Sequence, residues 1–324
     1  MTPTYHIHNM DCIEGMAAHL EPESCHLCVT SIPFGALFQY SAKTEDIGNN
    51  HDGLDMRASE FGLNMRFFIE QLRRVMAPGA VVCIHIQQLI ATKVQHGFMG
   101  RRDLRAAVVD LFGAGGFDWT GEVAIPKNPQ SMAQRLKLHS LMFGTGARDS
   151  RAWAPAMNDY VMIFRKPGEG RPVPALYYPK QGNTDGWLTT EDWIRWASGV
   201  WHDIMEIDVL DGYKSARETD EEKHVCPLQL EVIRRCVLMY SNPGDTVIDP
   251  FGGIGSTGWV CLGAPSPTTG LAVNAPRNVV LFELKESYYD QALRNCRLAL
   301  DRRHTADSLP LLDWLDTHPV EEVA

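Results

Sequence analysis

Four consecutive residues, Ser31-Ile32-Pro33-Phe34, end an apolar run with a hydroxyl, a proline and an aromatic ring. One interpretation is a strand end followed by a turn, because proline cannot donate a hydrogen bond to a sheet ladder. The other is a rigid platform at the carboxyl edge of a sheet, where open α/β sheets bind their ligands. The four residues alone favour the turn, so the choice depends on the rest of the chain.

A second stretch, from Asp249 to Gly258, could bind a cofactor. Gly253, Gly255 and Gly258 form a GxGxxG pattern after a predicted strand and at the start of a predicted helix. Such glycines let the backbone approach a ligand, and Glu283, at the end of the next predicted strand, could accept hydrogen bonds from a ribose diol. The pattern predicts an adenosine-bearing cofactor, either a dinucleotide or S-adenosylmethionine. A tight turn without a ligand is the alternative.

Strands and helices alternate around both stretches. Apolar runs and helical spacing predict strands at 5–9, 25–30, 80–86, 246–249 and 278–283, and helices at 12–20, 65–76, 227–241, 256–263 and 287–303. This alternation implies an α/β fold with a parallel sheet and crossover helices.

The position of the glycine loop separates the two cofactors. A dinucleotide-binding fold usually starts with this loop, yet only about 65 residues follow Gly258. The missing strands must therefore come from the N-terminal half, in circularly permuted order. That arrangement brings the carboxyl ends of strands 25–30 and 246–249 together and turns Ser31-Ile32-Pro33-Phe34 toward the reactive end of the cofactor.

With TSIPF before DPFGGIGSTG, the chain resembles the permuted (beta-class) DNA amino-methyltransferases. This family transfers a methyl group from S-adenosylmethionine to the exocyclic amino group of cytosine or adenine, on a Rossmann-like sheet. Its catalytic tetrapeptide is Ser, Asp or Asn, then Pro-Pro, then an aromatic residue, so Ile32 departs from the pattern. Its cofactor loop, Asp-Pro-Phe-x-Gly-x-Gly, is matched by Asp249, Pro250, Phe251, Gly253 and Gly255.

The resemblance implies roles for individual residues. Ser31 Oγ and the Ile32 carbonyl oxygen would accept hydrogen bonds from the target amine, and Pro33 would fix the direction of that carbonyl. Phe34 would stack on a base flipped out of the duplex. The implied cofactor contacts are Asp11 at the adenine, Glu283 at the ribose, and His224, Asp249, Phe251, Gly253, Gly255, Ser256 and Thr257.

The resemblance leaves the target base open. Serine at the first tetrapeptide position is commoner for the N4 of cytosine and aspartate for the N6 of adenine, so Ser31 favours cytosine. Three further functions stay open: a methyltransferase with a non-DNA acceptor, an NAD-dependent oxidoreductase and a non-catalytic DNA-binding module.

The resemblance also predicts how the chain is divided into regions. Residues 1–100 would hold the catalytic half, and 223–305 the cofactor-binding half. Residues 101–222 would contain a strand pair, at 119–126 and 158–167, with an inserted target-recognition region, and 306–324 would be a loose acidic tail.

A basic segment lies between the two strands of that pair. Five cations within 25 residues are opposed only by Asp149, a net charge of 5 − 1 = +4, although the whole chain carries a formal −10. Because phosphate contacts require positive charge, we expect this segment to bind double-stranded DNA. A solvated loop that is basic by chance is the alternative. The cations are Lys127, Arg135, Lys137, Arg148 and Arg151.

Two pairs of possible metal ligands predict no metal site. Cys25 and Cys28 form a CxxC, but residues three apart on a strand should point to opposite faces. His6 and His8 share a strand face without clear further ligands.

The bulk composition predicts a globular cytoplasmic protein. Hydrophobic residues make up 44% and charged residues 22%, and no apolar run approaches the ~20 residues of a membrane span. The first residues do not form a signal peptide, and eight cysteines are too few for a disulfide scaffold. A homodimer and a restriction-nuclease partner are both compatible with these features.

Overall fold

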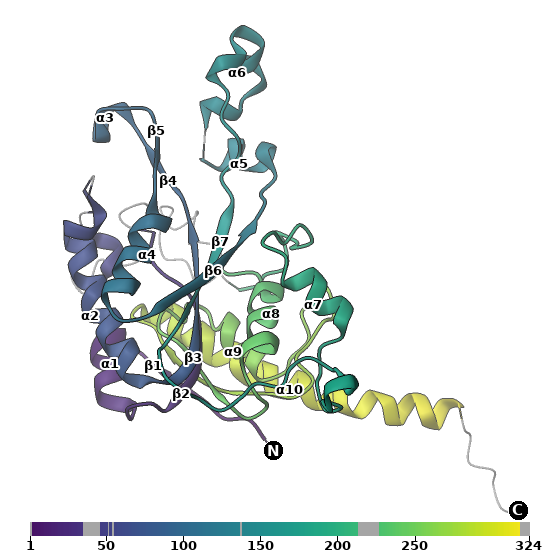
Figure 1. The fold of residues 1–324 in the computed structure, drawn as a ribbon. Coiled ribbons are helices and arrows are strands. Elements are labelled where there is room, and N and C mark those ends of the chain that lie inside the picture. Colours follow the sequence, from purple (N-terminus) through teal and green to yellow (C-terminus); the bar gives the residue numbers. More distant parts are fainter. Residues whose placement is uncertain are drawn as a thin grey trace, which may run out of the picture.

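A seven-stranded sheet forms the centre of the protein in a computed structural model, which describes residues 2–34, 46–50, 52–53, 55–136, 138–212 and 227–317 (Figure 1). The first five strands across the sheet are parallel, and the last two alternate in direction. This architecture confirms the predicted α/β fold. In spatial order the strands are β1 (Tyr5–His8), β9 (Asn278–Phe282), β8 (Thr246–Asp249), β2 (Cys25–Ser31), β3 (Met76–Gln87), β7 (Asp159–Arg165) and β6 (Asp118–Ile125).

The predicted circular permutation is confirmed in the middle of the sheet. β2 and β8 are neighbours, with Leu27 opposite Val247, although they come from opposite halves of the chain. β1 pairs with β9 at the edge, so the first strand joins the C-terminal strands. The two halves are therefore interlocked in one sheet, and the carboxyl ends of β2, β8 and β9 lie at the same edge.

Helices cover both faces of the sheet (Figure 1). On one face, Phe68 and Phe112 are fully buried beneath α1 (Cys12–His19), α2 (Glu60–Val75) and α4 (Leu104–Ala114). On the other, Ile233 and Cys296 are fully buried beneath α8 (Leu230–Tyr240), α9 (Ser256–Cys261) and α10 (Glu286–Thr317). Pro227 was expected in the first turn of α8, but it precedes the N-cap, Gln229.

The C-terminal helix is longer than the sequence predicted. A loose tail was expected from residue 306, whereas α10 continues to Thr317 and extends away from the body (Figure 1). Four leucines and one alanine between 306 and 317 favour a helix, and Pro310 does not end it.

Two projections rise from the carboxyl edge of the sheet (Figure 1). The β4–β5 arm, residues 89–102, consists of β4 (Leu89–Ala91), α3 (Lys93–His96) and β5 (Gly100–Arg102). The tower, residues 126–158, connects β6 to β7 and carries α5 (Pro129–Leu136) and α6 (Phe143–Arg148). These elements are too short to produce a periodic signal in the sequence, and both projections stand near the place where β2 and β3 end.

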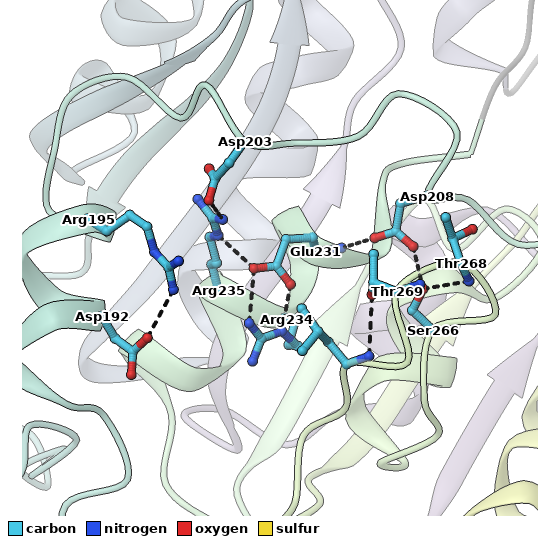
Figure 2. Close-up of polar contacts among 11 residues, drawn as sticks. Asp192, Arg195, Asp203, Asp208, Glu231, Arg234, Arg235, Ser266, Thr268 and Thr269 are labelled. Carbon is cyan, nitrogen blue, oxygen red and sulfur yellow. Dashed lines mark hydrogen bonds and ion pairs between the residues drawn. The ribbon is translucent and has the colours of Figure 1, made fainter.

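The segment from 166 to 212 packs on the body instead of projecting from it. It contains α7 (Thr190–Trp196), and buried Trp196 packs against Leu238 of α8. Figure 2 shows the polar network at this contact, in which Arg235 of α8 donates to Asp203 at 2.7 Å and to Glu231 at 2.8 Å. Asp208 accepts from the Glu231 amide at 3.0 Å and from the Ser266 hydroxyl. The expected target-recognition region is thus two different structures, the tower and a body-bound segment.

The CxxC cysteines do not point to opposite faces, contrary to the prediction. Cys25 and Cys28 both pack into the core beneath α1 and α2, because the pairing register of β2 with β3 shifts between Cys25 and Leu27.

Among the described residues, no three His, Cys, Asp or Glu side chains gather in a way that could hold a metal ion. Within the same residues, no helix is long and apolar enough to span a membrane.

Candidate active site

A cavity at the carboxyl edge of the sheet brings together both stretches that the sequence singled out. Its lining comes from the end of β2, the glycine loop after β8, the end of β9 and the start of α1. The predicted residues that line it are Asp11, Ser31, Pro33, Phe34, Asp249, Phe251, Gly253, Ser256, Thr257 and Glu283.

Asp249 holds the glycine loop against the middle of the sheet. One carboxylate oxygen accepts from the Thr30 hydroxyl at 2.5 Å and from the Phe251 amide at 3.1 Å, and the other accepts from the Thr257 hydroxyl at 2.6 Å. Burial raises the pKa of Asp249, and these hydrogen bonds oppose the rise. Because both oxygens are bound to the protein, Asp249 connects β2, β8 and α9 and shapes the cavity floor.

Glu283 presents a carboxylate at the end of β9. It accepts from the Gly253 amide at 2.8 Å and from the Lys285 amide at 2.9 Å. Burial raises the pKa of Glu283 to about 7; the two amides oppose this rise, and the charges of Asp249 and Asp46 add to it. Each carboxylate oxygen can accept a second hydrogen bond, so Glu283 keeps the capacity to bind hydroxyl groups.

Two glycines of the loop adopt backbone conformations that residues with side chains disfavour. Gly253 has φ +52° and Gly255 φ +86°, a region that side chains disfavour. A Cβ on Gly255 would also lie 3.1 Å from the Cα of Ala292 in α10. The loop therefore passes close to α10 and exposes its backbone to the cavity.

Asp11 and Phe251 also make contacts that stabilise the fold. Asp11 caps α1 by accepting hydrogen bonds from the amides of Ile13 and Glu14. The Phe251 ring packs against Phe68 with a centroid distance of 5.2 Å. Both still line the cavity, so each can fix the loop that it occupies and contact a ligand.

Three residues of the tetrapeptide, Ser31, Pro33 and Phe34, line the same cavity as the glycine loop. Ile32 is buried in the core, and Phe34 is 9% exposed, with its ring tilted toward the His85 imidazole at a centroid distance of 5.8 Å. Ser31 Oγ lies 2.9 Å from His85 Nδ1. SIPF is thus a platform in the cavity wall and not a simple surface turn.

Behind Ser31, charged side chains form a line that the sequence did not reveal. His85 Nε2 lies 3.3 Å from Asp159 Oδ2, and Lys127 Nζ lies 2.6 Å from the same oxygen. The His85–Asp159 pair is close but not aligned as a hydrogen bond. Burial alone would raise the pKa of Asp159, but His85 and Lys127 outweigh it and lower that pKa.

Strand pairing could have indicated part of this line. Ser31 is opposite His85 in the parallel β2–β3 pair, and Gln87 is opposite Asp159 in the antiparallel β3–β7 pair. Because side chains alternate along a strand, these residues share one face. Other cavity residues that the sequence did not single out are Asp46, Gln87, Gln229, Lys285 and Tyr288.

The predicted DNA-binding residues do not form one exposed strip. Lys127 is buried and ion-paired with Asp159, so it faces the cavity and does not lie on an exposed surface with the other four cations. Arg148 is exposed and donates to the Gly144 carbonyl of its own helix. Arg151 is exposed and paired with Asp149 at 2.9 Å. Lys137, the Arg135 side chain and the expected cofactor contact His224 lie outside the described residues.

The chain is similar in sequence to a DNA methylase family and to proteins named as type II methyltransferases. The DNA methylase family profile N6_N4_Mtase matches residues 25–294. The type II methyltransferase M.MjaI of Methanocaldococcus jannaschii is 25% identical over 291 residues, 83% of this chain and 84% of that protein. The type II methyltransferase M.MthZI of Methanothermobacter thermautotrophicus is 25% identical over 228 residues, 68% of this chain and 54% of that protein.

Solved structures share the fold. A provisionally named DNA modification methylase from Thermus thermophilus, in complex with S-adenosyl-L-methionine, matches with a TM-score of 0.60 at 20% identity, over 92% of this chain and 95% of that one. The cytosine-N4-specific PvuII DNA methyltransferase matches with a TM-score of 0.55 at 15% identity, over 94% of both chains. Because the family profile spans most of the chain, this protein belongs to the N4/N6 DNA methylase family and is an S-adenosylmethionine-dependent methyltransferase.

Proposed function

We propose that this enzyme methylates the exocyclic N4 of cytosine in double-stranded DNA. The observation that carries the proposal is the presence of Ser31 and Phe34 in the same cavity as the glycine loop and Glu283. Ser31 supports cytosine, because serine at this position of the tetrapeptide is commoner in cytosine enzymes. The PvuII enzyme, which shares the fold, is specific for cytosine N4.

The cofactor side of the cavity fits S-adenosylmethionine, which supplies an electrophilic methyl group when bound. Glu283 would accept hydrogen bonds from the ribose hydroxyls, and Asp11, at the start of α1, would contact the adenine. The backbone at Gly253, which lines the cavity together with Ser256 and Thr257, would allow close approach, whereas Gly255 is buried and would shape the loop.

The acceptor side fits an amino group. The lone pair of an exocyclic amine is delocalised into the base, so the nitrogen is a poor nucleophile. Ser31 Oγ and the Ile32 carbonyl oxygen would accept its two N–H groups and pull it toward tetrahedral geometry. Pro33 would hold that carbonyl in place, and Phe34 would stack on the flipped base. Positioning then supplies much of the rate, and no covalent enzyme intermediate forms.

Product identification tests this proposal. Unmethylated DNA is incubated with the protein and S-adenosylmethionine, digested to nucleosides and analysed by mass spectrometry, with Ser31→Ala as the matched control. N4-methylcytosine that depends on Ser31 is expected. N6-methyladenine would move the target to adenine, and C5-methylcytosine would overturn the amino-group mechanism. Calorimetric titration with S-adenosylmethionine and with NAD separates the cofactor question from the base question.

A further inference from the structure

Three buried titratable side chains lie in line behind Ser31, and the chemistry above does not use them. His85, Asp159 and Lys127 are each less than 10% exposed, and each lines the cavity. They come from three different segments: β3, the start of β7 and the residue two after the end of β6. Such a buried set of charges is costly to maintain, which suggests a role beyond packing.

The charge of Asp159 favours one tautomer of His85. Asp159 carries a negative charge beside Nε2, since Lys127 lies 2.6 Å from the same carboxylate oxygen. A carboxylate at Nε2 favours a proton on that nitrogen, which leaves the lone pair of Nδ1 facing Ser31 Oγ at 2.9 Å. The Ser31 hydroxyl can then donate to Nδ1 while its own lone pairs face the cavity.

Methylation of an amine requires a proton acceptor. As the amine nitrogen forms its bond to the methyl carbon, the carbon–sulfur bond breaks and its electron pair stays on sulfur. The nitrogen becomes positively charged and must lose one proton to give the neutral methylated base.

We propose that His85 accepts this proton through Ser31. The amine proton moves to Ser31 Oγ while the Ser31 hydroxyl proton moves to His85 Nδ1. The products are the neutral methylated base and an imidazolium, which later loses its proton to water. Asp159 stabilises the imidazolium, and Lys127 keeps Asp159 ionised. His85 is thus a positioning residue that acts through Ser31, and this role rests on the proposed function.

The surroundings of His85 set the expected pH dependence. The groups that face it are Ser31 from β2, Asp159 from β7 and Lys127 after β6, while the cofactor-side carboxylates Asp249 and Glu283 line the same cavity. His85 must be neutral to accept a proton, so the rate should fall under acidic conditions in which the ring is already protonated. The Asp159 carboxylate favours the imidazolium, and the Lys127 ammonium opposes it.

A histidine substitution gives the first test. His85→Asn keeps an acceptor near Ser31 but cannot take a proton, and His26→Asn, at the other end of β2, is the matched control. Single-turnover methylation should fall about 100-fold or more in His85→Asn, while the dissociation constant of S-adenosylmethionine stays unchanged. The acidic limb of the pH–rate profile should disappear. A wild-type rate or a retained limb in His85→Asn would overturn the inference.

Two neighbouring substitutions should move the acidic limb of the pH–rate profile in opposite directions. Asp159→Asn removes the anion and should shift this limb to lower pH, whereas Lys127→Met removes the cation and should shift the limb to higher pH. The Asp159→Asn/Lys127→Met double variant, which buries no unpaired charge, should have its acidic limb between those of the two single variants. NMR titration of the His85 ring without DNA should place the protonation midpoints of the variants in the same order. This measurement does not depend on catalysis.

These outcomes separate the inference from the proposed function. Shifts in the same direction for both single variants would overturn the role of His85. If the wild-type enzyme forms no N-methylated base, the proposed function fails even when the NMR order is as expected. If it forms the methylated base while His85→Asn remains fully active, only the inference fails.

Discussion

The two walls of the cavity hold buried carboxylates in opposite ways. On the cofactor wall, Asp249 and Glu283 are bound by hydroxyls and backbone amides, and burial raises the pKa of each. On the acceptor wall, Asp159 lies between His85 and Lys127, which lower its pKa against the effect of burial. The carboxylates of the cofactor wall therefore accept hydrogen bonds from neutral donors. The carboxylate of Asp159, on the acceptor wall, lies instead beside a titratable side chain and a cationic one.

This difference separates two tasks. A wall with neutral donors can hold a ligand through hydroxyl groups without moving protons. A wall with a fixed anion next to a histidine can change its protonation during each reaction cycle. Substitutions on the cofactor wall should therefore change affinity, and those on the acceptor wall should change the rate.

Ser31→Ala should produce the largest effect. The variant loses the hydroxyl that contacts His85 and, in the proposed function, the amine. Single-turnover methylation should fall by about 10²–10³-fold, because loss of one positioned polar group at a reacting centre has an effect of this size. The dissociation constant of S-adenosylmethionine, measured by calorimetry, should stay within about twofold of wild type.

Ser24→Ala is the matched control, because Ser24 immediately precedes β2, at the end away from the cavity, and donates to the Glu21 carbonyl. Equal losses in both variants would mean that Ser31 acts through folding, and the contrast between the two walls would fail.

Phe34→Ala should have the next largest effect, on the same wall. Loss of a stacking face costs about 1–3 kcal/mol per base, so kcat/KM should fall about 5-fold to 150-fold. A 2-aminopurine at the target position reports base flipping by its fluorescence, which should be weaker with the variant. Full activity together with a wild-type fluorescence change would exclude the stacking role.

Glu283→Gln tests the cofactor wall. The variant removes the negative charge that would accept ribose hydroxyls, and charge-assisted hydrogen bonds contribute about 1.5–3 kcal/mol each before losses. Binding of S-adenosylmethionine should weaken about tenfold in calorimetry, while the methylation rate at saturating cofactor changes little. A large loss of rate with unchanged affinity would reverse the assignment of the two walls.

The raised pKa of Glu283 also predicts a smaller effect on stability. A carboxyl group whose folded pKa is about 7 binds more protons in the folded than in the unfolded state, so its contribution to stability falls as pH rises toward 7 and above. Relative to Glu283→Gln, the ligand-free wild type should lose about 1 kcal/mol of unfolding free energy between pH 6 and pH 8. Urea unfolding of both proteins at these two pH values measures the difference. If the difference in unfolding free energy between the two proteins is the same at both pH values, Glu283 ionises normally.

The cofactor wall was predictable from sequence because its residues are close together in the chain. Asp249 ends β8, Gly253 and Gly255 lie in the loop that follows, and Glu283 comes directly after β9. The acceptor wall depends instead on strand pairing. His85 and Asp159 meet only because β7 runs antiparallel to β3, and the weak periodicity after residue 101 did not predict their register. The burial of Lys127 was not predicted for a related reason: net charge along the chain does not show which cation is buried.

The smallest expected effect concerns the tower, where charge should act on DNA without changing either wall. Arg148 is exposed, and no carboxylate among the described residues pairs with it, whereas Arg151 is already paired with Asp149. Arg148→Ala should weaken binding to all DNA sequences and reduce the slope of log affinity against log salt by about 0.9, the value for one phosphate contact. Arg151→Ala should reduce that slope less, and Asp149→Asn should strengthen binding by freeing Arg151. Fluorescence anisotropy at several salt concentrations measures these slopes, and the affinity for S-adenosylmethionine should not change. If all three variants keep the wild-type slope, residues 148–151 do not contact phosphates, and the β4–β5 arm becomes the next region to test.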